Sequence, residues 1–177
     1  MSESELNNII EALSEPFSSE FIEWKPLAIS GQRALAAAYV DVRRYQERLD
    51  LVCQWESRIE LLTNSESVVA KVALTIAGVT REEVGEADPS EQNAVTTAVA
   101  QAFKRACAAF GLGRYLYFLP QVWCQYDPQQ RKIVTPPTLP VWALAPGERL
   151  DLAEAKAAAR ERTILSELYA EEVVDLD

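Results

Sequence analysis

The chain has 177 residues, of which 49% are hydrophobic and 25% are charged, which is typical of one globular domain rather than of a disordered or fibrous protein. No run of apolar residues approaches the roughly 20 that cross a bilayer, and the first residues carry acids where a secretory signal carries positive charge, so we expect a cytoplasmic protein without a membrane partner. The absence of histidine excludes Ser/His/Asp and Cys/His nucleophiles and His-containing zinc sites.

The formal net charge of −10 is concentrated at the two ends of the chain. Residues 1–24 contribute −6, residues 148–177 contribute −5, and residues 25–147 stand at +1. A polyanion is bound through Lys and Arg, so the total charge argues against a nucleic-acid partner. The field at a surface depends on local arrangement, however, and the near-neutral centre can carry positive patches. The acidic ends either serve solubility alone or have a function of their own.

The first part of the chain predicts two helices separated by an irregular segment. Apolar residues at helical spacing predict an amphipathic helix over residues 3–13. Residues 17–30 show no clear period and contain Pro26, so we expect a loop or an edge segment there. A second helix is predicted over residues 41–52, with Asp41 as its N-cap.

The hydrophobic period then changes from helical to alternating. Residues 55–62 and 68–77 predict the two strands of a hairpin, and residues 80–87 predict a third, antiparallel strand whose glutamates suit an edge position. The most regular helix of the chain is predicted over residues 91–110, where a Gly-Leu-Gly sequence ends it. This order predicts an α+β domain in which one long helix covers one face of an antiparallel sheet.

The last part of the chain mixes aromatic, proline-rich and alanine-rich sequence. Residues 114–126 are rich in aromatic and β-branched side chains and predict further extended structure. The alanine-rich residues 150–170 predict a terminal helix. We therefore expect an acidic N-terminal helix in residues 1–15, a core domain in residues 16–147 and an acidic helical tail in residues 148–177.

Sequence signatures of an enzyme are missing. The Gly-Leu-Gly sequence follows a helix instead of opening one, so it cannot present helix N-terminal amides to a phosphate, and no GxxxxGK sequence occurs. Adjacent carboxylates such as Glu82 and Glu83 point to opposite faces of a strand, which is a poor geometry for acid–base work. Cys53, Cys107 and Cys124 lack metal-ligand spacing and predict free thiols. We expect no catalytic site, no metal and no cofactor.

The most distinctive stretch is residues 103–117. On the predicted helix, Lys104 and Arg105 lie away from the apolar stripe, on the side that carries Thr97 and Gln101. Two adjacent cations beside small residues can reach the phosphates of a polynucleotide. Cations near a helix C-terminus also stabilise the helix dipole without any ligand, so both interpretations are open at this point.

Several segments together resemble a known family. They are Trp24-Lys25-Pro26, Tyr39-Val40-Asp41 with Arg43 and Arg44, the hairpin of residues 55–77, and the stretch of residues 103–117. The pattern resembles the single-strand annealing proteins of the Rad-fifty-two superfamily, and above all their bacterial DNA-damage-response branch called DdrA, over roughly residues 16–125. The resemblance implies an antiparallel β-β-β-α core that assembles into a ring. It also implies that single-stranded DNA follows a positively charged groove outside the ring, with its bases presented for pairing.

The resemblance further implies roles for individual residues. The lysine-arginine pair on the family's long helix corresponds to Lys104 and Arg105, and the arginine after the Tyr-hydrophobic-acid sequence corresponds to Arg44. We add three weaker candidates for DNA binding, which are Arg43, Lys71 and Arg114. Lys71 can instead be a solvated strand residue, and Arg114 a helix-end or subunit-interface residue. The aromatic residues Tyr115, Tyr117 and Trp123 can either stack on bases or belong to the core.

Two hypotheses about function follow. The first is single-stranded DNA binding and annealing, or DNA end protection, in recombinational repair by a homo-oligomeric ring whose acidic tails confine the DNA or recruit a repair protein. The second is an acidic oligomeric protein-interaction module that keeps the fold but not DNA binding. The net charge favours the second, as does Ala108 at a position that is basic in some family members. Only the first predicts that affinity falls steeply with salt.

Overall fold

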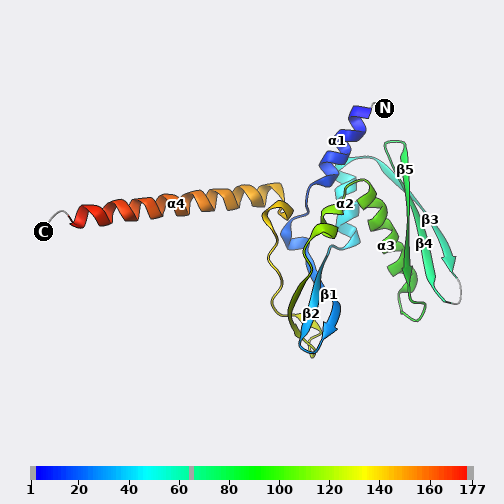
Figure 1. Ribbon diagram of the computed structural model, residues 1–177. Helices are drawn as coiled ribbons and strands as arrows, with labels where there is room; N and C mark the ends of the chain where they lie inside the picture. Colours follow the sequence, from blue (N-terminus) through cyan, green and yellow to red (C-terminus); the bar gives the residue numbers. More distant parts are fainter. Residues whose placement is uncertain (1–2, 64–65, 175–177) are drawn as a thin grey trace.

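The computed structural model describes residues 3–63 and 66–174, which form two antiparallel sheets and the helices around them (Figure 1). The predicted α+β class with antiparallel sheets is confirmed. The sheet predicted from the alternating pattern consists of β3 (Trp55–Thr63), β4 (Val68–Ile76) and β5 (Val79–Ala87) in that order. Residues 64 and 65 of the predicted turn lie outside the described residues.

The helix α3 (Ala94–Ala109) packs across β4 and β5. It begins three residues later than the prediction, which started it at Glu91. Gly85 of β5 allows the close approach, because a Cβ atom there would collide with the backbone of Ala98 and Ala102. The helix buries the small or apolar residues Ala94, Ala98, Ala102, Phe103, Ala106 and Cys107.

The predicted apolar stripe of this helix needs a correction at its first turn. The apolar spacing of Val95, Val99 and Ala102 in the sequence predicts that Val95 faces the sheet, but Val95 is 46% exposed. Ala94 and Ala98 face the sheet instead, and both are buried. At Ala98 the physical reason is the close contact with Gly85, which leaves room for a methyl group but not for a branched side chain.

Two further helices complete the core by packing against one another and against α3. They are α1 (Glu3–Ser14) and α2 (Val42–Val52), and both predictions are confirmed. The carboxylate of Asp41 accepts a hydrogen bond of 2.9 Å from the backbone N–H of Arg43 and so caps α2 as expected. Leu13 and Leu49 are fully buried between these helices and α3.

A second sheet was not foreseen. Its strands are β1 (Glu23–Ser30), β2 (Arg33–Tyr39), β6 (Val122–Asp127) and β7 (Lys132–Ile133), paired in the order β1-β2-β6-β7. β1 is the edge strand and has an irregularity in register between Pro26 and Ala28, consistent with the expected edge segment. β2 escaped prediction because it is mostly alanine, which carries no alternating pattern.

The prediction that residues 114–126 are extended is wrong for its first part. Arg114–Phe118 form a 3-10 helix, η2, and only β6 is extended. The backbone of Gly111 and Gly113 has φ of +99° and +72°, so the chain turns sharply after α3. A side chain at Gly113 would also collide with the buried ring of Tyr45.

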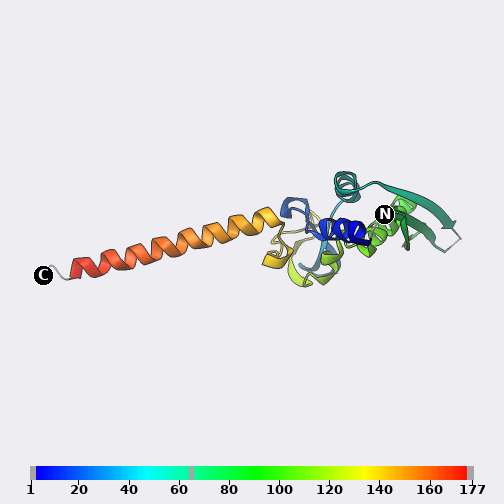
Figure 2. The same cartoon turned by 90° about the horizontal axis from the view of Figure 1, so that it is seen from above.

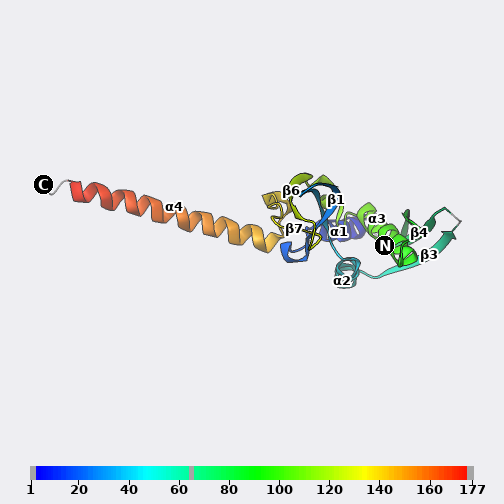
Figure 3. The same cartoon turned by 90° about the horizontal axis from the view of Figure 1, so that it is seen from below.

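The last helix, α4 (Pro146–Val174), is longer than predicted and projects away from both sheets (Figures 1, 2 and 3). The carboxylate of Glu148 connects the first turn of α4 to Ser19 and Ala145 through hydrogen bonds. One carboxylate oxygen accepts hydrogen bonds of 2.8 Å and 2.6 Å from the backbone N–H and the hydroxyl of Ser19, and the other accepts 2.9 Å from the N–H of Ala145. None of the described helices combines the length and the apolar character that a membrane span needs.

Candidate nucleic-acid interface

Two ammonium groups meet at one aromatic ring where the second sheet approaches α3. The Nζ atom of Lys104 lies 3.8 Å from the centre of the Tyr39 ring, and the Nζ atom of Lys25 lies 3.3 Å from it. Lys25 pairs across the strands with Ala37, two residues before Tyr39, so Lys25 and Tyr39 share one face of the sheet. Each ammonium is attracted by the ring and the two repel one another, and a carboxylate oxygen of Glu23 lies 3.4 Å from the Nζ atom of Lys25.

Burial leaves Lys104 poorly solvated. The pKa of Lys104 is lowered to about 8, mainly by loss of water around the ammonium and then by the charge of Lys25, while Asp41 acts in the opposite direction. A negative group placed beside Lys104 would reverse this shift, because it would stabilise the charged form. An anion bound beside Lys104 would therefore be attracted by its ammonium and would stabilise the charged form of the lysine.

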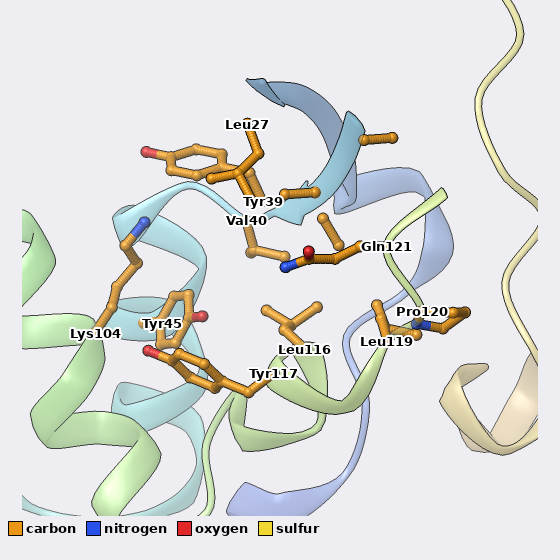
Figure 4. Close-up of a pocket in the computed structure, with 13 residues that line it drawn as sticks. Leu27, Tyr39, Val40, Tyr45, Lys104, Leu116, Tyr117, Leu119, Pro120 and Gln121 are labelled. Carbon is orange, nitrogen blue, oxygen red and sulfur yellow. The ribbon is translucent and has the colours of Figure 1, made fainter. Parts of the chain in front are cut away.

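Lys104 and Tyr39 lie between two hollows of the surface, and both line each of them. The first hollow has a volume of about 280 Å³ and lies between β2 and the segment that joins η2 to β6. Figure 4 shows Lys104 at its rim and Tyr45, Leu116, Tyr117 and Gln121 around it. Its lining is largely apolar or aromatic.

The second hollow, of about 650 Å³, lies between the start of α2 and the first half of α3. Thr96, Thr97 and Gln101 contribute hydroxyl and amide groups to its wall. Gln101 accepts a hydrogen bond of 3.0 Å from the backbone N–H of Glu86 through its oxygen, which leaves its NH₂ group as a donor. The N-terminal turns of both helices also border the hollow and favour negative charge there. We call this second hollow the α2–α3 hollow.

Arg43 joins Lys104 at the α2–α3 hollow. Its side chain is 82% exposed and lies 3.8 Å from a carboxylate oxygen of Asp41. Of the described residues that line this hollow, Asp41 alone is acidic, and it is already held by the start of α2. The structure thus brings together Lys104 and Arg43, which were both predicted, with Lys25 and Tyr39, which were not.

Arg105 and Arg44 are placed elsewhere. Arg105 reaches across to β5, where its guanidinium donates a hydrogen bond of 2.8 Å to the backbone oxygen of Val84. Arg44 donates to Glu47 at 2.8 Å and stacks 4.0 Å above the ring of Phe21. Arg44 lines a hollow that Arg43 also borders and that is rich in carboxylates, which come from Glu20, Glu23, Asp41 and Glu47. Lys104 and Arg105 are neighbours in sequence, but the structure directs them to different elements.

Lys71 and Arg114 are engaged within the protein. The Nζ atom of Lys71 lies 3.0 Å from Glu82 and 4.0 Å from Glu60, on the face of the first sheet opposite α3. Arg114 donates hydrogen bonds of 2.7 Å and 2.5 Å to the carbonyl oxygens of Ala108 and Ala109 at the C-terminus of α3. Arg114 therefore stabilises the C-terminal end of the helix dipole. From the sequence alone, Lys104 and Arg105 were candidates for this role.

The three aromatic candidates differ in how far they are buried. Tyr115 accepts a hydrogen bond of 3.1 Å from the backbone N–H of Phe17, and burial raises its pKa to about 12, so it belongs to the core. Tyr117 and Trp123 remain 65% and 42% exposed. Tyr39 could have been found from the sequence only by recognising that residues 33–39 pair with residues 23–30.

Residues 5–133 of the chain match the model of the Rad52/22 family of double-strand break repair proteins. The chain belongs to the Rad52/22 family. The matched region of the Rad52/22 model contains Lys25, Tyr39 and Lys104 and ends before α4 begins. Across the part of the chain that the structure describes, no group of three or more Cys, Asp and Glu side chains is arranged to hold a metal ion.

Curated relatives within the Rad52/22 family bear the name of the predicted branch. The single-stranded DNA-binding protein DdrA of Deinococcus radiodurans is 40% identical over 148 residues, which cover 81% of this chain and 71% of that protein. The protein of the same name from Deinococcus deserti is 38% identical over 148 residues, which cover 81% of this chain and 74% of that protein. No solved structure matches the chain significantly. The resemblance to the DdrA branch is thereby confirmed.

Proposed function

We propose that this chain binds single-stranded DNA along the α2–α3 hollow and acts in recombinational repair, by annealing complementary strands or by protecting DNA ends. The observation that carries the proposal is the pair of ammonium groups on the Tyr39 ring at the edge of this hollow. Membership of the Rad52/22 family and the name of the two DdrA relatives support it.

The proposed contact is with the sugar-phosphate backbone. Lys104 and Arg43 neutralise phosphates, and the hydroxyls of Thr96 and Thr97 donate hydrogen bonds to them. Binding of this kind carries no sequence information and leaves the Watson–Crick edges of the bases free. Free base edges are what a complementary strand needs in order to anneal, so no catalytic group is required.

We further propose that the chain works as a homo-oligomer, in the form of a ring. Ile59 and Leu61 of β3 point to the same side of the sheet as α3, because they pair with Val72 and Ala70 of β4. The helix covers β4 and β5, and these two side chains stay 55% and 48% exposed. An apolar edge strand of this kind is commonly covered by a neighbouring subunit. A ring repeats Lys104 along one strand of DNA and so multiplies weak contacts.

The acidic ends have a part in this proposal. Residues 148–177 contribute −5 to the charge and lie mainly in the projecting helix α4. Negative charge there repels DNA from the rest of the surface and can attract a basic segment of a repair protein. We place this activity in the cytoplasm.

A salt titration tests the proposal. The affinity of the full chain for a fluorescent, unstructured oligonucleotide is measured by anisotropy at several salt concentrations, and the molar mass is measured by light scattering with and without DNA. We expect the logarithm of affinity to fall linearly with the logarithm of salt concentration, with a slope of about −0.7 for each phosphate neutralised. An oligomer that ignores DNA at low salt would establish the alternative, an interaction module without DNA binding.

A further inference from the structure

The second sheet presents one face that continues away from the Tyr39 ring. The register of β1, β2 and β6 places Lys25 beside Ala37, Leu35 beside Trp123, and Arg33 beside Gln125. Residues on cross-strand partners, and at every second position of a strand, share a face. Lys25, Leu35, Arg33 and Trp123 therefore lie on the same side as Tyr39, whereas the opposite side buries Ala34 and Ala36.

At the far end of this face, Arg33 and Trp123 lie against one another. The guanidinium carbon of Arg33 is 5.9 Å from the centre of the Trp123 ring. An Nη atom of Arg33 also lies 3.4 Å from the carbonyl oxygen of Trp123, which accepts its hydrogen bond. Trp123 is 42% exposed, and Arg33 is exposed as well. An indole in this position contributes little to the core, since much of its surface remains in contact with water.

The Arg33–Trp123 pair and the Lys104 site belong to one surface. Arg33 and Tyr39 are separated by six positions of one strand, which corresponds to about 20 Å. The register puts one carboxylate at the Lys25 end of this face, that of Glu23, which pairs with Tyr39 and lies 3.4 Å from the Nζ atom of Lys25. Among the described residues, it puts none between Lys25 and Arg33. Positive charge at both ends with an exposed aromatic ring at one of them is the composition of a surface that binds single-stranded nucleic acid.

We propose that Trp123, held by Arg33, forms a stacking platform for a base of single-stranded DNA that leaves the α2–α3 hollow across this face of the second sheet. This inference rests on the proposed function and adds a base contact to what is otherwise binding through phosphates. The indole stacks on the base, and Arg33 contacts the adjacent phosphate. Because stacking uses the face of the base, the platform accepts any base.

The platform has a consequence for annealing. A base stacked on Trp123 is fixed in position through its face, whereas bases above the α2–α3 hollow are held only through their phosphates. In each subunit, one base of the strand would then be fixed and its neighbours would be free to move. We expect the platform to fix the position of the DNA strand relative to each subunit. We do not expect it to select a particular base sequence.

The experiment compares four variants of the full chain with the parent protein. Trp123→Ala removes the ring, Trp123→Phe keeps an aromatic face, Arg33→Gln removes the charge, and Trp142→Ala removes an exposed indole from the 3-10 helix η3 (Val141–Ala143). Each variant is first checked by circular dichroism and thermal unfolding. Affinity is then measured for a mixed-sequence oligonucleotide and for an abasic oligonucleotide of the same length, over a range of salt concentrations.

Stacking predicts a specific set of results. Trp123→Ala should weaken binding of the normal oligonucleotide roughly tenfold and leave the salt slope unchanged, while its affinity for the abasic strand stays as in the parent. Trp123→Phe should restore most of the affinity, and Trp142→Ala should change nothing. Arg33→Gln should weaken both oligonucleotides and reduce the magnitude of the salt slope by about 0.7 for the phosphate it no longer neutralises.

The outcomes separate the two proposals. If the parent protein binds the normal oligonucleotide with steep salt dependence and Trp123→Ala binds it equally well, the platform is refuted and the proposed function stands. The same conclusion holds if Trp123→Ala weakens the abasic strand as much as the normal strand. If the parent protein binds neither strand, the proposed function itself fails.

Discussion

The ammonium group of Lys104 lies 3.8 Å from the centre of the Tyr39 ring, in a place where water is scarce and Lys25 is close. The lysine comes from the long helix and the tyrosine from the end of a strand in the other sheet. This contact joins α3 to the second sheet at the α2–α3 hollow, and burial there makes the charge of Lys104 sensitive to pH in the ordinary laboratory range.

DNA binding should weaken as the pH rises through about 8. The pKa of Lys104 is lowered to about 8, so the free protein loses this charge well below the range of an ordinary lysine. Binding to a phosphate must then include uptake of a proton, and affinity should fall about tenfold between pH 7.5 and 9.5. Anisotropy measurements at constant ionic strength check this. The variant Lys104→Arg keeps its charge over the whole range and should bind with little dependence on pH.

Replacing Lys104 with methionine should separate binding from stability. The methionine keeps an apolar chain of similar length and removes a charge that burial disfavours, so the free energy of unfolding should stay the same or rise. Affinity for single-stranded DNA should fall at least tenfold, since a charged hydrogen bond contributes about 1.5–3 kcal/mol. Denaturant unfolding and salt titration of the same preparation measure both effects.

Lys71→Met is the matched control, because it removes the same charge. Lys71 is paired with Glu82 and Glu60 on the face of the first sheet opposite α3, and we expect its replacement to change DNA affinity less than twofold. Equal losses from both variants would mean that only the total charge matters, and the assignment of Lys104 to the binding site would then be abandoned.

Gly85→Ala should destabilise the fold. A Cβ atom at Gly85 would collide with the backbone of Ala98 and Ala102, and neither can move without shifting α3 on β5. Overpacking of this kind costs about 1–3 kcal/mol in the free energy of unfolding. Gly147→Ala is the control, because a Cβ atom there has no neighbour within 4 Å. Chemical denaturation should show a large loss for the first variant and none for the second, and two similar curves would argue against close packing at Gly85.

Glu148→Gln should loosen the base of α4 in a manner that depends on pH. Burial alone would raise the pKa of Glu148, but the hydrogen bonds from Ser19, Ala145 and Ser18 together hold it below its usual value. A carboxylate of this kind contributes stability above its ordinary pKa and loses it as the pH falls through the lowered value. The variant should therefore lose about 1 kcal/mol near pH 7, as for a helix cap. In urea denaturation near pH 3, the difference from the parent should shrink, and a constant difference would contradict the role of the charge.

Deleting residues 150–177 should strengthen DNA binding at low salt. These residues contribute −5 to the net charge, and their removal leaves the cations of the α2–α3 hollow less opposed. The gain should disappear at high salt, because screening then removes the repulsion in the full chain as well. Unchanged affinity and unchanged salt dependence in the truncated protein would count against a role of the acidic tail in DNA access.

Local patterns determined much of this architecture. Alternation over residues 55–87 predicted β3, β4 and β5, and Asp41 before an amphipathic run predicted the start of α2. These signals lie within windows of about ten residues, where side-chain periodicity and capping decide the conformation. β2 was missed since a run of alanines fits a helix or a strand equally, and the 3-10 helix η2 was missed since its aromatic residues favour strands.

The binding site depends more on the tertiary structure. The sequence alone singled out Lys104 and Arg43, together with Arg44, Arg105, Lys71 and Arg114. The packing of segments that are distant in sequence decides which of these cations lines the α2–α3 hollow, which pairs with a carboxylate, and which donates a hydrogen bond to a carbonyl oxygen. Lys25 and Tyr39 reach Lys104 only because β1 and β2 fold against α3. Sequence periodicity determines which face of a helix or strand is buried. Which group each charged side chain contacts is decided by the packing of segments that are distant in sequence.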